Sequence, residues 1–387
     1  MNKVFYWSPF ISKVATVKSV LNSAEAVNRS FKKDNYKAYI IDAVHEWKGF
    51  EDEIKQKKIE LIYLNKNSVF NLYKKDGFLR SRLAYWYIFF KSFFPLIKIL
   101  QKQKPDYFVI HLISSLPLFL FIIKNFKSKL ILRISGLPKM TLFRKLLWKL
   151  ASKNIYKITC PTIDTFNDLS KFEFLRKKLS VLNDPIINIK EIQKSRKREV
   201  IINEDLNYII SNKKFLLSIG RFTKQKNFLF YLNCIPEILK LDQELYFLFI
   251  GQGEETKKFL EISNKLNISD KIFIIDYTKN VHYFMKKAQA LVLPSLWEDP
   301  GFVLVEAGYN NCQVLSSNCP NGPSEIIAED GGYLFESNSK NSLIKTIGFF
   351  LQDTIENRML KKIILKKRLK KFTSFHHTLK LRNNILN

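Results

Sequence analysis

Two glutamates and the backbone between them form the most informative pattern in this 387-residue sequence. Glu298 follows a short apolar run, and Glu306 lies eight residues further on, about one turn into a helix that we expect to begin near Phe302. The N–H groups of Gly301, Phe302 and Val303 would then lie at a helix start, where they lack intrahelical partners and the helix dipole is positive. The pattern predicts an anion site flanked by two carboxylates.

Two cations follow another predicted strand. Residues 215–219 form an apolar run that ends at Gly220, and Arg221 and Lys226 come next. Fixed cations at the carboxyl end of a strand suit a diphosphate leaving group, because they stabilise the charge that develops as a bond to phosphate breaks. Carboxylates accept paired hydroxyl hydrogen bonds, so the combination matches a sugar nucleotide, a diphosphate between two polyhydroxyl rings. From spacing alone, the pair are equally well read as exposed cations in a lysine-rich protein.

These segments resemble motifs of a known family. The run SIGRFTKQK, residues 218–226, resembles the G-R-x-x-x-x-K segment of family 4 retaining glycosyltransferases. Glu298 and Glu306 are similar to their E-x7-E motif, which is followed by a loop that ends in Glu325. The resemblance is clear over residues 213–335 and weaker over the first 185 residues.

The resemblance implies a fold, a chemistry and a role for each motif residue. It implies the α/β fold called GT-B, with two Rossmann-like domains facing a central cleft, and no required metal or other cofactor. Arg221 and Lys226 would hold the donor diphosphate, together with the helix start at residues 301–303. Glu306 would bind the nucleotide ribose, and Glu298 would contact the donor sugar near the reacting carbon. Glu325 is expected at the same donor site.

The sequence departs from the family pattern at three places. Asp299-Pro300 replaces a common Gly-Phe, residues 311–313 replace a Gly-x-Pro, and residues 321–325 replace a Gly-Gly before the last glutamate. The run CPNGP, residues 319–323, looks like enzymes that build bacterial surface polysaccharides. These departures leave the diphosphate site intact and the donor sugar unidentified.

The first half holds candidate acceptor-side residues. Ser8 and Lys13 follow the first predicted strand, and His111 ends a later one, where similar glycosyltransferases place a histidine. A lone histidine at a strand end is as readily structural. The segment from Arg133 to Lys139 either lines the acceptor side or forms a tight turn. The other four histidines lack a partner pattern and are expected at the surface: His45, His282, His376 and His377.

The charge is strongly asymmetric. The formal net charge is +29, with +23 in residues 1–200, −2 in residues 201–350 and +8 in the remainder. Such an excess favours an anionic partner, either a membrane surface or nucleic acid. Residues 79–100 mix Lys and Arg with Trp, Tyr and Phe, which suits a helix on anionic lipid. An ordinary buried helix fits the same stretch.

Composition and length set the remaining bounds. Hydrophobic residues make up 46% of the chain, enough for two ordinary cores. The four cysteines have no CxxC spacing, and the N-terminus lacks the features of a secretory signal, so we expect a cytoplasmic protein. Its longest apolar runs are shorter than the roughly 18–20 residues that span a bilayer, so we expect peripheral rather than integral association with the inner face of the membrane.

Alternating strand and helix patterns predict two α/β units with parallel sheets. We place the first over residues 1–185, a linker over 186–212, and the nucleotide-sugar-binding unit over 213–365. A basic helical tail, 366–387, follows, and we expect the C-terminal helices to pack back on the first domain.

The sequence therefore predicts a retaining hexosyltransferase. It would move a sugar from a nucleotide diphosphate donor, a UDP-sugar, to a glycan or a lipid-diphosphate-linked acceptor in O-antigen-like or capsule-like biosynthesis. The alternatives are a sugar-nucleotide epimerase of the same architecture, a non-catalytic partner of that fold, and a basic nucleic-acid-binding protein. The last is disfavoured, because no zinc spacing, RNA-recognition signature or basic heptad helix is present.

Overall fold

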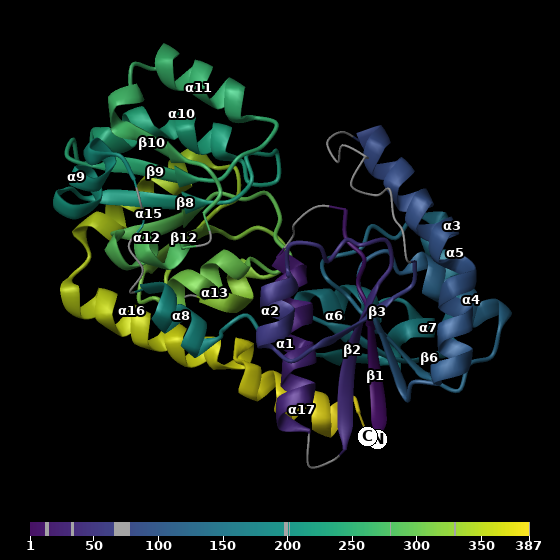
Figure 1. Cartoon of the computed structure of the whole chain (residues 1–387). Coiled ribbons are helices and arrows are strands. Elements are labelled where there is room, and N and C mark those ends of the chain that lie inside the picture. The colour runs from purple at the N-terminus through teal and green to yellow at the C-terminus, as the bar shows by residue number, and fades with distance from the viewer. Residues whose placement is uncertain are drawn as a thin grey trace. The chain divides into compact units, whose positions relative to one another are not determined.

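The chain folds into two compact units in a computed structural model, which describes residues 1–11, 15–31, 35–65, 78–196, 200, 202–278, 280–328 and 330–386. The first unit comprises Met1–Ile186 together with Thr373–Asn387, and the second comprises Ile187–Phe372. Each unit is built on one parallel sheet with helices packed on it (Figure 1). The predicted class of two Rossmann-like α/β domains is confirmed.

The first sheet has seven strands in the order β3-β2-β1-β4-β5-β6-β7, and every pairing is parallel. Its strand order reverses between β1 and β4, so the loops that follow these two strands diverge and leave a crevice at their carboxyl ends. The strands are β1 (Asn2–Trp7), β2 (Tyr36–Asp42), β3 (Glu60–Tyr63), β4 (Tyr107–Ile110), β5 (Lys129–Arg133), β6 (Ile155–Cys160) and β7 (Leu179–Val181).

Both faces of the first sheet are covered, which explains why its central strands are largely apolar, with Val4–Trp7 of β1 and all of β4 buried. Along β1, Phe5 and Trp7 enter the core beneath α3, α4 and α5, while Val4 and Tyr6 enter the core beneath α1, α2 and α17. The helices of this unit are α1 (Ala15–Ser30), α2 (Glu51–Gln56), α3 (Phe78–Gln103), α4 (Ser115–Ile123), α5 (Leu142–Ala151), α6 (Ile163–Ser170), α7 (Glu173–Arg176) and α17 (Ser374–Asn384).

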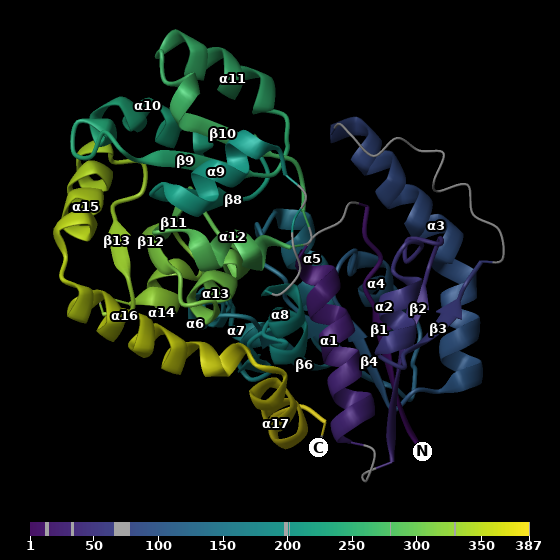
Figure 2. The ribbon, with the colours of Figure 1, turned by 60° about the vertical axis from the view of Figure 1, so that its left-hand side comes forward.

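The C-terminal segment completes the first unit, as the sequence predicted. Helix α17 lies against α1 in both views (Figure 1 and Figure 2). Leu381 of this helix, together with Ile385 and Leu386 just after it, joins the same core as α1. The Tyr36 hydroxyl donates to the backbone oxygen of Leu386 at 3.0 Å. The end of the chain is thus part of a core formed mainly by the beginning of the chain.

The second sheet repeats the design with six parallel strands in the order β10-β9-β8-β11-β12-β13. Here the order reverses between β8 and β11, the two strands that precede the predicted cation and glutamate motifs. The strands are β8 (Phe215–Ile219), β9 (Tyr246–Ile250), β10 (Ile272–Ile275), β11 (Ala290–Leu293), β12 (Gln313–Ser317) and β13 (Tyr333–Phe335).

Helices α10, α11 and α15 cover one face of this sheet through a core rich in phenylalanine, and α13 contacts β11 and β12. The α-helices of the second unit are α8 (Ile189–Arg196), α9 (Glu204–Asn212), α10 (Phe228–Leu239), α11 (Thr256–Lys265), α12 (Val281–Lys287), α13 (Phe302–Tyr309), α14 (Pro323–Ile327), α15 (Lys340–Gln352) and α16 (Ile355–Arg368); the 3₁₀ turns are η2 (Ser269–Lys271) and η3 (Leu369–Phe372).

The boundaries between the units differ from the prediction. The range 186–212, expected as a linker, contains α8 and α9, and both belong to the second unit from Ile187 onward. Charge and an Asp-Pro pair suggested a linker, but Leu206, Ile209 and Ile210 of α9 are buried and anchor that helix. The predicted tail, 366–387, is divided, because η3 closes the second unit while α17 belongs to the first.

Candidate active site

The predicted cation and glutamate motifs lie at the switch point of the second sheet. Lys226 belongs to the loop that leaves β8, and Glu298 belongs to the loop that leaves β11, the neighbouring strand. Open α/β sheets bind ligands in the crevice at such a point, outside the carboxyl ends of the strands. The two motifs, 72 residues apart in sequence, therefore meet at one edge.

Glu298 is a buried residue, only 4% exposed, and one of its two carboxylate oxygens accepts two hydrogen bonds. Its Oε1 accepts a hydrogen bond from Lys226 Nζ at 2.5 Å and another from Ser295 Oγ at 2.5 Å. The aliphatic part of Lys226 passes close to Gly220, where a Cβ would lie 2.9 Å from Lys226 Cε. The absence of a side chain at Gly220 thus lets the lysine reach the carboxylate.

Neighbouring segments also hold the Glu298 loop. Asn321 Nδ2 donates to the backbone oxygen of Glu298 at 2.9 Å and to Asp299 Oδ1 at 3.1 Å. Gly322 has φ 131°, and a Cβ there would lie 2.0 Å from the oxygen of Pro300. On the other side, Gln225 Nε2 donates to the backbone oxygen of Trp297 at 3.1 Å. Two of the three departures from the family pattern, Asp299-Pro300 and the segment that holds Asn321 and Gly322, therefore pack against each other and fix the loop.

A helix start lies next to this carboxylate, as predicted. Gly301 precedes α13 with φ 89°, a conformation that glycine adopts without strain, and Phe302 is the first helical residue. No side chain caps this end of α13. Phe302, Val303 and Glu306 are all partly exposed residues of α13, and Glu306 lies just over one helical turn beyond the start. The helix thus presents backbone N–H groups between Glu298 and Glu306.

The two other predicted donor-site residues differ in their surroundings. Arg221 is exposed directly after Gly220 at the end of β8. Glu325, in α14, forms an ion pair with Lys371 at 2.9 Å between Oε1 and Nζ. One oxygen of Glu325 therefore already has a cationic partner.

The acceptor-side candidates lie at the switch point of the first sheet. Ser8 follows β1 and His111 follows β4, and His111 N donates to the oxygen of Trp7 at 2.9 Å. Both side chains are buried, yet neither Ser8 Oγ nor either ring nitrogen of His111 has a hydrogen-bond partner among the described residues. Burial, with the nearby Arg133 and His377, holds the pKa of His111 well below its usual value. Lys13 lies outside the described residues.

Arg133 is buried in the first unit and paired with Asp184, so its charge is not available to an acceptor. Its guanidinium forms a buried ion pair with Asp184 and lies 3.5 Å from His377 Nε2. His377 also contacts Ser23 Oγ at 2.9 Å and the backbone oxygen of Asn183 at 2.9 Å. The predictions of surface positions for His377 and His282 are wrong, since both are at most 5% exposed.

Sequence reasoning missed Ser295 and Asn321 as supports of the glutamate loop. For Ser295 the signal is polarity just after an apolar strand, which many loops share, and for Asn321 it is the position within the CPNGP run, which gave no sign of a contact with Glu298. Among the described residues, no group of three or more His, Cys, Asp and Glu is placed to hold a metal ion. The site as a whole offers a lysine and a helix start for an anion, and a carboxylate for hydroxyl groups.

Comparison with known proteins agrees with this geometry. Residues 204–367 match the family described as glycosyl transferases group 1. The chain is 28% identical over 261 residues to an uncharacterized glycosyltransferase of Methanocaldococcus jannaschii, which covers 62% of each protein. It is 23% identical over 237 residues to the Campylobacter jejuni N-acetylgalactosamine-N,N'-diacetylbacillosaminyl-diphospho-undecaprenol 4-alpha-N-acetylgalactosaminyltransferase, which covers 59% of this chain and 61% of that protein. The matched regions thus span about three fifths of these relatives.

The fold itself has close counterparts. Anabaena HepE, solved in complex with UDP and glucose, superposes with a TM-score of 0.74 at 12% identity, covering 100% of this chain and 99% of that one. At such low identity the likeness establishes the fold, which is GT-B.

Proposed function

Since residues 204–367, within the second unit, match the family of glycosyl transferases group 1, we propose that the chain is a retaining glycosyltransferase. It would transfer a sugar from a nucleotide diphosphate, a UDP-sugar, to a glycan or lipid-linked acceptor during the synthesis of a bacterial surface polysaccharide. The observation that carries the proposal is the contact of Lys226 with buried Glu298 beside the start of α13, at the switch point of the second sheet.

Donor binding follows from the charges around this contact. Lys226, Arg221 and the N–H groups of residues 301–303 would surround the diphosphate, with no metal required. Glu325 would stand at the edge of this site. Because Lys226 now pairs with Glu298, a bound phosphate would share the lysine with the carboxylate. Glu298 would then accept hydrogen bonds from the donor sugar hydroxyls, and Glu306 would accept those of the nucleotide ribose.

The proposed reaction develops negative charge on the leaving phosphate oxygen, next to Lys226, Arg221 and the start of α13. The acceptor hydroxyl would attack the anomeric carbon on the face that the diphosphate leaves, the bond to the phosphate oxygen would break, and the departing phosphate would receive the hydroxyl proton. Lys226, Arg221 and the helix start stabilise the charge that develops on the leaving oxygen. Preorganised donors of this kind act without further rearrangement.

Ser8 and His111 are proposed to orient the reacting hydroxyl. Their support is the unpaired buried polar atoms of Ser8 and His111, since such atoms cost free energy unless a ligand or water satisfies them. The lowered pKa of His111 keeps its ring neutral, so it would serve as a hydrogen-bonding group.

The C. jejuni relative is named for a diphospho-undecaprenol acceptor. An acceptor on a lipid diphosphate would place the protein at the cytoplasmic face of a membrane, and this is the location we propose.

The test is sugar transfer by the purified protein with a panel of nucleotide sugars and a lipid-diphosphate-linked acceptor. We expect a glycosylated acceptor and UDP, formed in equal amounts, and a bond that keeps the anomeric configuration of the donor. Any donor that binds the folded state should also raise the melting temperature. Release of a free epimerised donor without acceptor would overturn the proposal in favour of an epimerase. Tight binding of DNA but not of UDP would favour a nucleic-acid-binding protein.

A further inference from the structure

Three neighbouring helices of the first unit expose large apolar side chains. On α3 these are Leu83, Trp86, Phe90 and Phe94, each at least 51% exposed. Helix α5 adds four that are at least 50% exposed, and α4 adds two more. We call the set of ten the apolar helix face: Leu83, Trp86, Phe90, Phe94, Phe119, Ile123, Leu142, Phe143, Leu146 and Leu150. A patch of this size on one side of a unit indicates an interaction surface.

Helix α3 is two-sided. Ala84, Ile88, Leu96 and Leu100 are buried and join the core above the sheet. The exposed residues follow a second stripe at spacings of three and four, along which Trp86 and Phe90 stack with ring centroids 5.6 Å apart. Residues 82–103 are long and apolar enough to cross a membrane by length and composition, and 28% of an 18-residue stretch within them is buried. Because one stripe packs on the sheet, only the other can meet a bilayer, which places α3 along the membrane surface.

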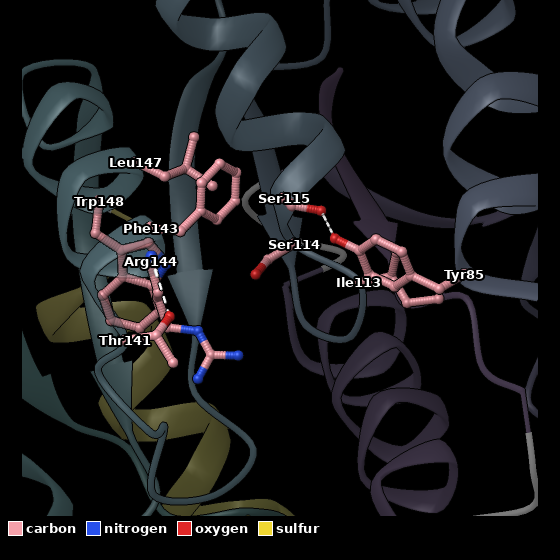
Figure 3. Close-up of a pocket in the computed structure, with 9 residues that line it drawn as sticks. All are labelled: Tyr85, Ile113, Ser114, Ser115, Thr141, Phe143, Arg144, Leu147 and Trp148. Atoms are coloured by element: carbon pink, nitrogen blue, oxygen red, sulfur yellow. Dashed lines mark hydrogen bonds between the residues drawn. The ribbon is translucent and has the colours of Figure 1, made fainter. Parts of the chain in front are cut away.

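The face is continuous from α3 to α5. Phe119 of α4 lies 6.5 Å from Phe89 and 6.3 Å from Phe93 between ring centroids, and α4 in turn contacts α5. A cavity of about 360 Å³ opens between these helices (Figure 3). Its wall combines apolar Phe143 and Trp148 with polar Ser114, Thr141 and Arg144.

The charged residues around the apolar helix face are almost all positive. Residues 78–154 contain fifteen Lys and Arg but a single acidic residue, Asp106. Lys91 and Lys98 are exposed on α3, and Lys145 and Lys149 are exposed on α5. Each such cation near an anionic membrane surface contributes about 1 kcal/mol to binding. Exposed aromatics flanked by cations match the interface of an anionic bilayer, where aromatic rings lie at headgroup depth.

We propose that the apolar helix face docks on an anionic lipid bilayer, and that the cavity beside α5 receives the phosphate of a lipid headgroup next to Arg144. The docking does not depend on the proposed sugar transfer, because binding to vesicles needs no donor. It gives the first unit a defined orientation toward the membrane.

Vesicle binding by the full chain tests the docking. We expect co-sedimentation with phosphatidylglycerol vesicles and little with phosphatidylcholine alone. In a Trp297→Phe background Trp86 is the one tryptophan that is more than 4% exposed, so its emission should shift to the blue on binding. The triple variant Trp86→Ser/Phe90→Ser/Phe94→Ser should partition at least ~10-fold less, since each ring loses its transfer free energy.

The control removes exposed apolar residues from another basic helix. The variant Met359→Ser/Leu360→Ser/Ile363→Ser on α16 changes side chains of similar exposure and should bind vesicles like the unaltered protein. Equal losses in both triple variants would overturn the proposal. The proposal would also be overturned if light scattering showed that the unaltered protein is a dimer that does not bind vesicles, and that only the α3 variant is a monomer. The apolar helix face would then contact a second copy of the chain. Release of bound protein by detergent but not by alkaline carbonate would point to a spanning helix instead.

The cavity is tested by two single-charge variants on the same helix. Arg144 lines the cavity, while Lys145 points toward the Phe172 ring, 5.8 Å from Nζ to its centroid. Arg144→Gln should lose several-fold more affinity for phosphatidylglycerol vesicles than Lys145→Gln, because both lose one charge but only Arg144 would contact a headgroup. Equal losses would contradict the cavity as a phosphate site.

Discussion

Replacing Lys226 with Met should lower kcat/KM about 10²–10³-fold, the effect of removing one preorganised donor to a developing anion. Lys226 Nζ lies 2.5 Å from Glu298 Oε1, and the Lys226 side chain is 15% exposed. The lysine therefore stands between a buried carboxylate and the space in front of the helix start. The loss should fall on kcat more than on UDP affinity, because the leaving oxygen gains charge only during bond breaking. Steady-state kinetics of sugar transfer and a UDP titration measure the two effects.

Lys224 provides the matched control for this variant. It is an exposed lysine in the same loop, two residues before Lys226. Lys224→Met should keep turnover within about twofold of the unaltered enzyme. Because Lys226→Met also leaves the buried Glu298 carboxylate with a hydrogen bond from Ser295 but no cation, circular dichroism must show that the variant is folded at the assay temperature. A folded Lys226→Met enzyme with full turnover would remove this residue from the proposed mechanism.

Replacing Asp184 with Ala should lower the free energy of unfolding by about 3–5 kcal/mol, since it leaves the buried guanidinium of Arg133 without its counter-ion. Arg133 and Asp184 are 3% and 5% exposed at their side chains. Ser19 Oγ, which donates to Asp184 Oδ1 at 2.5 Å, loses its acceptor as well. For a unit of this size the change corresponds to a fall of roughly 6–20 °C in melting temperature, measured by calorimetry.

The exposed pair Lys171–Asp168 shows what an ordinary ion pair contributes. Its side chains are 73% and 41% exposed, so Asp168→Ala should change the free energy of unfolding by less than about 1 kcal/mol. If the Asp184 and Asp168 variants unfold at the same temperature, the network around Arg133 does not stabilise the first unit in the way described here.

The alternation of strands and helices was readable from the sequence because the central buried strands are short, largely apolar runs. Phe215–Ile219 and Ala290–Leu293 are such runs, and each ends at a residue that breaks the pattern, Gly220 or Pro294. Placing the cation and glutamate motifs at strand ends therefore needed only local information. That these strands are neighbours depends on sheet order, which no local pattern encodes.

Long-range partners were beyond sequence reasoning for the same reason. His377 contacts Arg133 across 244 positions and Asn183 across 194. A histidine in a basic C-terminal segment gives no sign that its helix packs against the first helix of the chain. The pairing of Glu298 with Lys226 was likewise invisible, since each residue was assigned its role separately.

The exposed face of the first unit was predicted only in part. The aromatic and basic stretch within α3 stood out, but the sequence analysis did not single out Leu142, Phe143 and Leu146 of α5, which are exposed. Their exposure depends on which stripe of α5 meets α4. Only Trp148 and Ala151 of α5 are buried.

The second unit is proposed to hold the donor diphosphate between Glu298 and Glu306, and a structure of the protein with UDP tests this placement directly. We expect the diphosphate within hydrogen-bonding distance of Lys226 Nζ and of an N–H group at residues 301–303, with the ribose hydroxyls on Glu306. UDP bound away from the carboxyl ends of β8 and β11 would contradict the account.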